Sequence, residues 1–224
     1  MIKLQSKLMG IFHGHHWAIA LLVTFIFGCS ESKKSLPYLG QKSIETKVVD
    51  GKSVTDTVYH TIPDFEFINQ DSVVTTQKDV ANKIYVADFF FTTCPTICPK
   101  MKTQMLRIYE KYKNNPHFMI LSHTIDPRHD TPSVLKEFKK NLGIEGNQWQ
   151  MVTGDKMKIY ELGQKSYMVT ATDDPTQPGG IVHSGAFILV DKNRNIRGLY
   201  DGTVPEKVDQ LMNDIDLLLK EQYQ

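Results

Sequence analysis

The feature that most constrains the fold is an apolar run that leads directly into two cysteines. Residues 83–91 (KIYVADFFF) are rich in β-branched and aromatic side chains, which is typical of a strand buried on both faces of a sheet. Residues 94–99 (CPTICP) follow this run, and residues 100–113 are predicted to be helical. We therefore expect an α/β domain in which Cys94 and Cys98 lie where a central strand gives way to a helix.

The order of the remaining elements indicates which α/β fold this is. Two strands are predicted before the run, at residues 64–68 and 73–76. After the cysteines we expect strands at 118–124, 150–153, 185–191 and 196–200, and helices at 133–142, 156–167 and 206–221. Alternating strands and helices imply parallel pairing in the centre of the sheet. The sequence thus predicts a thioredoxin-like fold with an N-terminal β extension and a helical insertion.

The first 28 residues differ from the rest and are predicted to be a lipoprotein signal peptide. The apolar run at residues 17–27 is shorter than the roughly 20 residues that a membrane-spanning helix needs, but it matches the core of a secretory signal. It ends at Gly28 and Cys29 in a pattern that resembles a bacterial lipobox, so Cys29 is the expected lipidation site. An uncleaved short anchor is the alternative. Both place the protein in the bacterial cell envelope, with the domain outside the cytoplasm.

Residues 29–58 are predicted to connect this membrane anchor to the domain at residues 59–224. Residues 30–35 are polar and suit a flexible tether. Residues 36–59 alternate polar and β-favouring side chains around Asp50-Gly51, which is a hairpin turn signal. A short two-stranded β ornament is expected here.

The overall charge excludes one class of partner. The chain has 26 basic and 25 acidic residues, whereas nucleic-acid binding normally requires a basic excess or a basic stripe. We therefore expect no nucleic-acid partner.

The two cysteines are the primary candidate site. Residues four apart at the start of a helix lie about one turn from each other, so both sulfurs can reach one another or a single metal ion. The positive end of the helix dipole favours the thiolate, and soft sulfur ligands suit Cu(I), zinc or disulfide exchange. A purely structural disulfide is a weaker alternative because so short a loop restricts the unfolded chain little. Whether Pro95 or Pro99 begins the helix is open.

His183 is the best candidate for a third ligand. It lies just before a predicted strand, in the loop that faces the dithiol in thioredoxin-like folds, and there is no proline between Pro178 and Pro205 to occupy that position. His123 and His129 are less favoured as a fourth ligand.

The segment at residues 126–132 (DPRHDTP) is predicted to be a turn and a helix start. Asp130 or Thr131 is expected as the N-cap, with Pro132 at the first helical position. Asp126 is a secondary site candidate, either beside the metal or in contact with a partner.

Three motifs together resemble the Sco/SenC family over about residues 61–224: CPTICP after an apolar strand, DPRHDTP, and VHS before a further strand. The resemblance implies that Cys94, Cys98 and His183 bind one copper ion, as Cu(I) or Cu(II). It also implies assistance in assembling the dinuclear copper centre of respiratory cytochrome c oxidase. The implied partners are a copper-accepting oxidase subunit, a thiol reductant protein, and the membrane through the N-terminal lipid.

The predicted function is therefore that of a copper metallochaperone rather than an enzyme. One alternative is a membrane-anchored thiol-disulfide reductase that keeps partner cysteines reduced, which would need Cys94 and Cys98 but not His183. Another is a copper or redox sensor that signals without net copper transfer.

Overall fold

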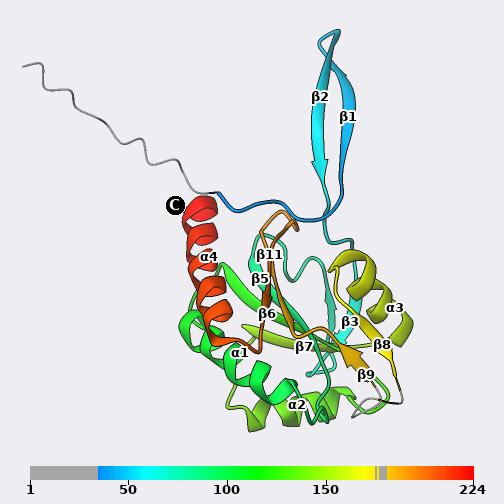
Figure 1. Cartoon of the computed structure of the whole chain (residues 1–224), viewed down its shortest axis with the longest axis vertical. Coiled ribbons are helices and arrows are strands. Elements are labelled where there is room, and N and C mark those ends of the chain that lie inside the picture. The colour runs from blue at the N-terminus through cyan, green and yellow to red at the C-terminus, as the bar shows by residue number, and fades with distance from the viewer. Residues whose placement is uncertain (1–34, 175, 177–180) are drawn as a thin grey trace, which may run out of the picture. The chain divides into compact units, whose positions relative to one another are not determined.

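The computed structural model describes residues 35–174, 176 and 181–224 of the 224-residue chain. Its main feature is a seven-stranded sheet with the strand order β11-β10-β5-β6-β7-β3-β4 (Figure 1). The three central strands β5, β6 and β7 are parallel, and the strands on both sides of them are antiparallel. The strands are β3 (Glu66–Asn69), β4 (Val74–Thr76), β5 (Ile84–Phe90), β6 (Phe118–Thr124), β7 (Trp149–Thr153), β10 (Ala186–Val190) and β11 (Ile196–Asp201).

Helices cover both faces of this sheet, which is why every residue of β5 and β6 is buried. Helices α1 (Cys98–Tyr112), α2 (Pro132–Asn141) and α4 (Pro205–Tyr223) lie on one face, and α3 (Lys156–Glu161) with the π-helical turn η1 (Leu162–Ser166) lies on the other. Adjacent residues of a strand point to opposite faces. Phe90 accordingly stacks on Phe138 of α2 at 5.7 Å between ring centroids, and Phe89 meets Tyr167 after η1 at 5.5 Å.

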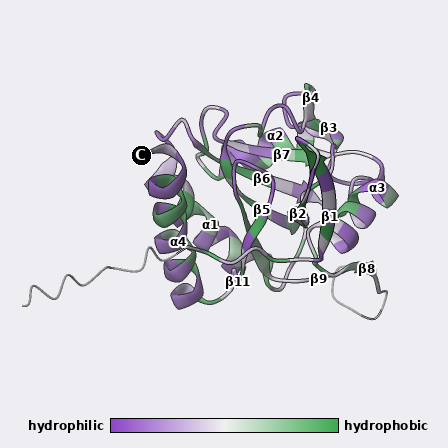
Figure 2. Cartoon of the chain, turned by 90° about the horizontal axis from the view of Figure 1, so that it is seen from above, coloured by the Kyte–Doolittle hydropathy of each residue, from purple (hydrophilic) through white to green (hydrophobic). Residues whose placement is uncertain are grey.

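The terminal helix shows how the sequence pattern produces this packing. Its buried apolar residues Val208, Leu211, Ile215 and Leu218 recur every three or four positions, which places them on one side of the helix. Figure 2 accordingly shows both hydrophilic and hydrophobic residues along α4. The hydroxyl of Tyr112 in α1 donates to the carbonyl oxygen of Met212 at 2.7 Å, which ties the two helices together.

The thioredoxin-like fold class is confirmed, with differences at element ends. The helix predicted at residues 100–113 begins at Cys98, so Pro99 lies in its first turn, where the missing N–H costs no hydrogen bond. The helix predicted at 156–167 is divided into α3 and η1. A small hairpin of β8 (Ala171–Asp173) and β9 (Ile181–His183) was not predicted, because strands of three residues carry too short a pattern to recognise.

The expected N-terminal ornament is a hairpin of β1 (Lys42–Val49) and β2 (Lys52–Tyr59). Asp50 and Gly51 both have left-handed backbone angles, with φ of 51° and 73°, as a two-residue hairpin turn requires. The predicted signal peptide, the lipidation site Cys29 and the first residues of the tether lie outside the described residues. Among the residues that are described, no helix is both long and apolar enough to cross a membrane.

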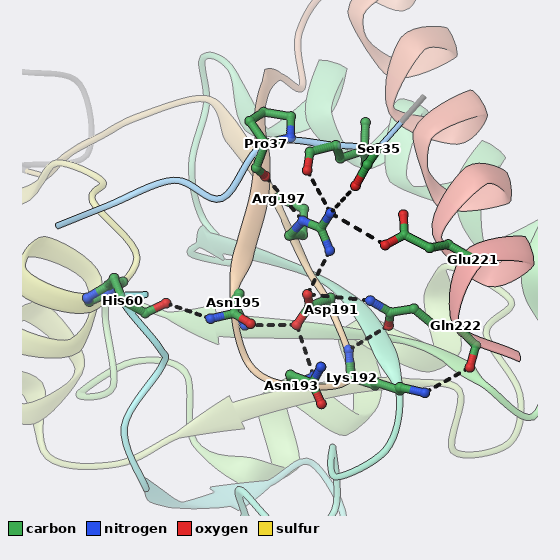
Figure 3. Close-up of polar contacts among 11 residues, drawn as sticks. Ser35, Pro37, His60, Asp191, Lys192, Asn193, Asn195, Arg197, Glu221 and Gln222 are labelled. Carbon is green, nitrogen blue, oxygen red and sulfur yellow. Dashed lines mark hydrogen bonds and ion pairs between the residues drawn. The ribbon is translucent and has the colours of Figure 1, made fainter. Parts of the chain in front are cut away.

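A buried ion pair fixes the point at which the chain enters the domain (Figure 3). The side chains of Arg197 and Asp191 are fully buried and lie 2.9 Å apart. The Arg197 guanidinium also donates to the carbonyl oxygens of Leu36 at 2.7 Å and Pro37 at 3.1 Å. Removing one partner of such a pair leaves a buried charge uncompensated, which is strongly destabilising. The segment that follows the tether is thus held on β11.

Candidate metal centre

The two cysteines lie in and after a short loop at the end of β5. The backbone N–H of Cys94 donates to the carbonyl oxygen of Phe91 at 3.3 Å, and its Sγ lies 3.6 Å from the hydroxyl oxygen of Thr96. Cys98 is the first residue of α1, after Ile97 at the N-cap. Both cysteines are present as thiols and are 8% and 7% exposed. One cysteine therefore precedes the helix and the other is its first residue, whereas the sequence predicted a helix that begins at residue 100, after both.

The two thiols have opposite shifts in acidity. Burial alone would raise the pKa of Cys94, but hydrogen bonds from the Cys98 thiol and from the backbone N–H groups of Thr96 and Cys98 outweigh it and lower that pKa. Burial raises the pKa of Cys98 strongly, and its hydrogen bond to Cys94 raises it further. Cys94 is therefore the thiol that ionises first, and the thiolate is the form that binds metal and attacks disulfides.

Asp130 holds this loop in place from the start of α2. Its carboxylate is fully buried and accepts hydrogen bonds from the Thr92 backbone N–H at 3.0 Å and the Thr92 hydroxyl at 2.5 Å. It also accepts from the Thr124 hydroxyl at the end of β6 at 2.5 Å, and it lies 3.0 Å from Nδ1 of His129. Asp130 thus joins the cysteine loop, β6 and α2. Of the two predicted N-cap candidates, Asp130 and Thr131, the structure shows Thr131, and Pro132 is at the first helical position as predicted.

A second buried carboxylate lies behind Cys98. Asp88 of β5 accepts a hydrogen bond from the Ser122 hydroxyl at 2.5 Å, and the Trp149 indole N–H donates to the same hydroxyl at 2.8 Å. Burial raises the pKa of Asp88 to about 7, although its hydrogen bond from Ser122 opposes the shift. Asp88, Ser122 and Cys98 line a cavity of about 20 Å³, which is large enough for one water molecule. Asp88 was not among the predicted site residues, although an acidic residue inside an otherwise apolar strand is a signal that could have identified it.

The backbone of His183 ends strand β9 and pairs with Ala171, while its side chain lies outside the described part of the chain. The loop that follows it lies against the cysteine loop. A Cβ atom on Gly185 would lie 3.7 Å from Cδ1 of Ile97, the residue before Cys98, and 3.2 Å from Cγ2 of Thr203. Gly185, two residues after His183, therefore lies next to the residue that precedes Cys98. The ligand role of His183 stays a prediction.

The other candidates are placed as follows. His123 is fully buried on the face of the sheet opposite to α1, stacked on Phe89 at 5.0 Å, and burial lowers its pKa to about 3. His129 is exposed, and its hydrogen bond with Asp130 raises its pKa. Asp126 begins the turn: its backbone N–H donates to the Thr124 hydroxyl, and its carbonyl oxygen accepts from the backbone N–H groups of His129 and Asp130. A role for the Asp126 carboxylate remains a prediction.

The donor set suits a soft metal ion. Within the described side chains, no three His, Cys, Asp or Glu residues converge on a metal site. Cys94 and Cys98 supply two soft sulfur ligands, and Gly185, in the loop that follows His183, lies against Ile97 between them in sequence. Thiolate and imidazole together suit copper or zinc. The arrangement can therefore hold a soft metal ion or exchange disulfides.

Comparison with known proteins identifies relatives over most of the chain. The profile of the SCO1/SenC family matches residues 54–220. The SCO1 protein homolog of Bacillus subtilis (strain 168) is 29% identical over 167 residues, which cover 74% of this chain and 86% of that protein. A SCO1/SenC family lipoprotein from Bacillus anthracis str. Ames has a crystal structure with a TM-score of 0.65 and 28% identity, over 71% of this chain and 95% of that one.

Two further solved structures resemble the chain. BsSco, a member of the Sco family of cytochrome c oxidase assembly proteins in which a disulfide switch was identified, has a TM-score of 0.62 and 29% identity, over 70% of this chain and 92% of that one. Copper-bound ScoI of Arabidopsis thaliana has a TM-score of 0.57 and 23% identity, over 69% of this chain and 97% of that one. At that identity the second likeness concerns the fold alone.

Proposed function

The chain belongs to the SCO1/SenC family, and on that premise we propose that it is a copper metallochaperone for cytochrome c oxidase. It binds one copper ion through Cys94, Cys98 and His183 and assists assembly of the dinuclear copper centre. The observation that carries the proposal is the pair of buried thiols beside the loop that follows His183. Copper is proposed as the metal because soft sulfur ligands suit Cu(I) and because a relative from Stutzerimonas stutzeri, 26% identical over 165 residues, is named as a copper-binding protein.

The two thiols differ in how readily they lose the proton that copper binding displaces. A ligand cysteine must lose its proton, so metal binding releases protons and strengthens as pH rises. Cys94, with its lowered pKa, provides the first thiolate. Cys98, with its raised pKa, gives up its proton less readily than Cys94, and metal binding favours its ionised form. Because the Cys98 thiolate is readily protonated again, the site can release copper by ligand exchange to the cysteines of an oxidase subunit.

The proposed location is the bacterial cell envelope, with Cys29 lipidated and the domain outside the cytoplasm. The lipobox-like sequence supports this location, and so does the relative from Bacillus anthracis, which is a lipoprotein. A thiol reductant protein in the same compartment would keep Cys94 and Cys98 ready for copper.

The first experiment is an anaerobic Cu(I) titration of the reduced protein against a competing chelator. We expect one copper per wild-type chain and an affinity at least about tenfold lower for His183→Ala. Even the loss of a residue that only hydrogen-bonds to a metal ligand lowers metal affinity by about 10–100-fold. His129→Ala is the matched control, because this exposed histidine lies near the cysteine loop but contacts Thr92 and Asp130 instead. Equal affinities for wild type and His183→Ala would remove His183 from the site.

The second experiment follows copper transfer to an apo-oxidase domain. Cys98→Ser should abolish transfer, whereas His129→Ala should leave it intact. Undiminished transfer by Cys98→Ser would contradict the metallochaperone proposal.

The opposite pKa shifts of the two cysteines favour thiol-disulfide exchange as a second candidate function. The readily ionised Cys94 would attack a partner disulfide, and Cys98 would resolve the mixed disulfide. A His183→Ala variant separates the two functions, because it should lose copper binding and keep disulfide reduction.

A further inference from the structure

The hairpin of β1 and β2 is the part of the molecule that the proposed function does not explain. Every residue of both strands is exposed, and Ile44 and Val48 are 74% and 73% exposed. Figure 1 shows no other strand or helix beside β1. The SCO1/SenC match begins at residue 54, so β1 lies outside it. An isolated two-stranded hairpin is marginally stable in water, and three or more strands are normally required.

The outer edge of β1 is open for pairing. Across the two-residue turn, the carbonyl oxygen of Val49 accepts from the N–H of Lys52 and so faces inward. Because the backbone groups of successive residues face opposite edges, those of Ile44, Thr46 and Val48 face away from β2. The register of the hairpin is continuous, without a bulge or proline. An edge strand of this kind is a template for another strand.

We propose that β1 pairs antiparallel with β1 of a second copy of this chain, about a twofold axis through Thr46. The result is a four-stranded sheet in the order β2-β1-β1-β2. In this register Glu45 of one copy lies opposite Lys47 of the other, and Ile44 lies opposite Val48. A twofold axis repeats each of these pairs, so the edge is complementary to itself in both charge and apolar character.

The charges of β1 select this register over its neighbours. Sliding one copy by two residues in one direction would place Glu45 against Glu45, and sliding it in the other direction would place Lys47 against Lys47. Like charges directly opposite each other destabilise a sheet, and opposite charges stabilise it. Within one chain Glu45 lies opposite Asp56 of β2, and its carboxylate is 3.6 Å from the Lys47 ammonium on its own strand, an exposed pair of the kind that contributes little to stability. The pattern on β1 therefore fits a second copy of β1.

This pairing leaves the cysteines accessible in both copies. At the base of the hairpin Thr61 bridges to Asn195, just before β11. Val190, at the adjoining end of β10, pairs with Tyr85 near the start of β5, whereas Cys94 follows the far end of β5. The proposed dimer interface and the metal centre therefore lie at opposite ends of the sheet, and the dimer does not depend on the proposed copper function.

Disulfide cross-linking tests the pairing directly. In full-length chains with Cys29→Ser, Cys94→Ser and Cys98→Ser, we add Thr46→Cys and oxidise the purified, detergent-solubilised protein. Residues opposite each other in a hydrogen-bonded antiparallel pair have Cα atoms about 5.5 Å apart, which suits a disulfide. Thr55→Cys is the matched control, since Thr55 is exposed and opposite Thr46 in the same chain, yet two strands separate the copies of Thr55. A covalent dimer with Thr46→Cys alone is expected. No dimer, or equal dimer with Thr55→Cys, would overturn the proposal.

Charge reversal provides the second test, with self-association measured by sedimentation. Glu45→Lys and Lys47→Glu should each weaken the dimer about tenfold or more, because two attractive pairs become repulsive. Mixing the two variants should restore association, since every pair between copies is again of opposite sign. Inside the hairpin Glu45→Lys relieves the Glu45–Asp56 pair but removes the exposed 3.6 Å contact between Glu45 and Lys47, so the recovery in the mixture, which hairpin unfolding would not give, is the deciding result. If the mixture associates no better than either variant, or if the hairpin binds only lipid vesicles, self-pairing is refuted.

Discussion

The Asp130→Ala substitution tests whether one carboxylate holds the cysteine loop in place. Asp130 is fully buried, and its two oxygens accept hydrogen bonds from the backbone and side chain of Thr92 and from the side chain of Thr124. Hydrogen bonds to charged groups are each worth about 1.5–3 kcal/mol, and an unsatisfied buried donor costs about 1–3 kcal/mol. Because these contributions are not additive, we expect a loss of about 3–5 kcal/mol in the free energy of unfolding.

Urea denaturation of the metal-free protein measures this loss. Thr131→Ala is the control, because the neighbouring Thr131 caps α2 through a long 3.5 Å hydrogen bond and does not contact the cysteine loop. That variant should lose about 1 kcal/mol, as typical N-cap substitutions do. Asp130→Asn should fall between the two, because the amide keeps one acceptor oxygen for the Thr92 N–H.

The same variants should differ in copper affinity. Thr92 lies two residues before Cys94, so freeing it allows the first thiol to leave its position at the end of β5. Asp130→Ala should therefore bind Cu(I) more weakly than Thr131→Ala when both are measured well below their unfolding transitions. If Asp130→Ala loses less than 1 kcal/mol, or binds copper as wild type does, the carboxylate does not hold the loop.

Two further substitutions test buried ionisable groups. Burial lowers the folded-state pKa of His123 to about 3, so the unfolded chain binds the extra proton, and this histidine should cost wild type stability relative to His123→Phe as pH falls from about 6.5 to 3. His123→Phe should remove this acid sensitivity in pH-dependent denaturation, and an unchanged slope would contradict it. Burial raises the pKa of Asp88 to about 7 from its ordinary value of 3.8, so the folded state binds the extra proton, and this carboxyl should cost wild type stability relative to Asp88→Asn as pH rises through that range. Asp88→Asn should flatten this dependence and be the more stable protein at pH 8; a wild type that is equally stable there would refute the shift.

The sequence predicted those parts of the fold whose cause is local. All seven residues of β5 and of β6 are buried, most of them are apolar, and both strands were predicted to within one residue at each end. The Asp50-Gly51 turn of the β1–β2 hairpin was recognised because two consecutive left-handed residues favour this dipeptide. The first turn of α1 was less certain, since two prolines could each begin a helix, and only the packed structure distinguishes Pro95 from Pro99.

The parts that the sequence could not predict depend on residues that are distant in the chain. Asp130 was recognised only as a cap candidate because its partners, Thr92 and Thr124, come from two other segments that the sheet brings together. The buried Arg197–Asp191 pair was missed for the same reason, since Arg197 also requires the carbonyl oxygens of Leu36 and Pro37.

The metal centre combines both kinds of information. The spacing of Cys94 and Cys98 is local, and it predicts two thiols close to each other, in line with the hydrogen bond between them. The approach of the loop after His183 is non-local, yet it followed from the fold class, because that loop precedes a strand next to β5. Neither the cysteine spacing nor the fold class predicts the difference in acidity between the two thiols, which arises from burial and from the hydrogen bonds at the start of α1. A chain with the same motif but a more exposed Cys98 should therefore bind copper with less dependence on pH.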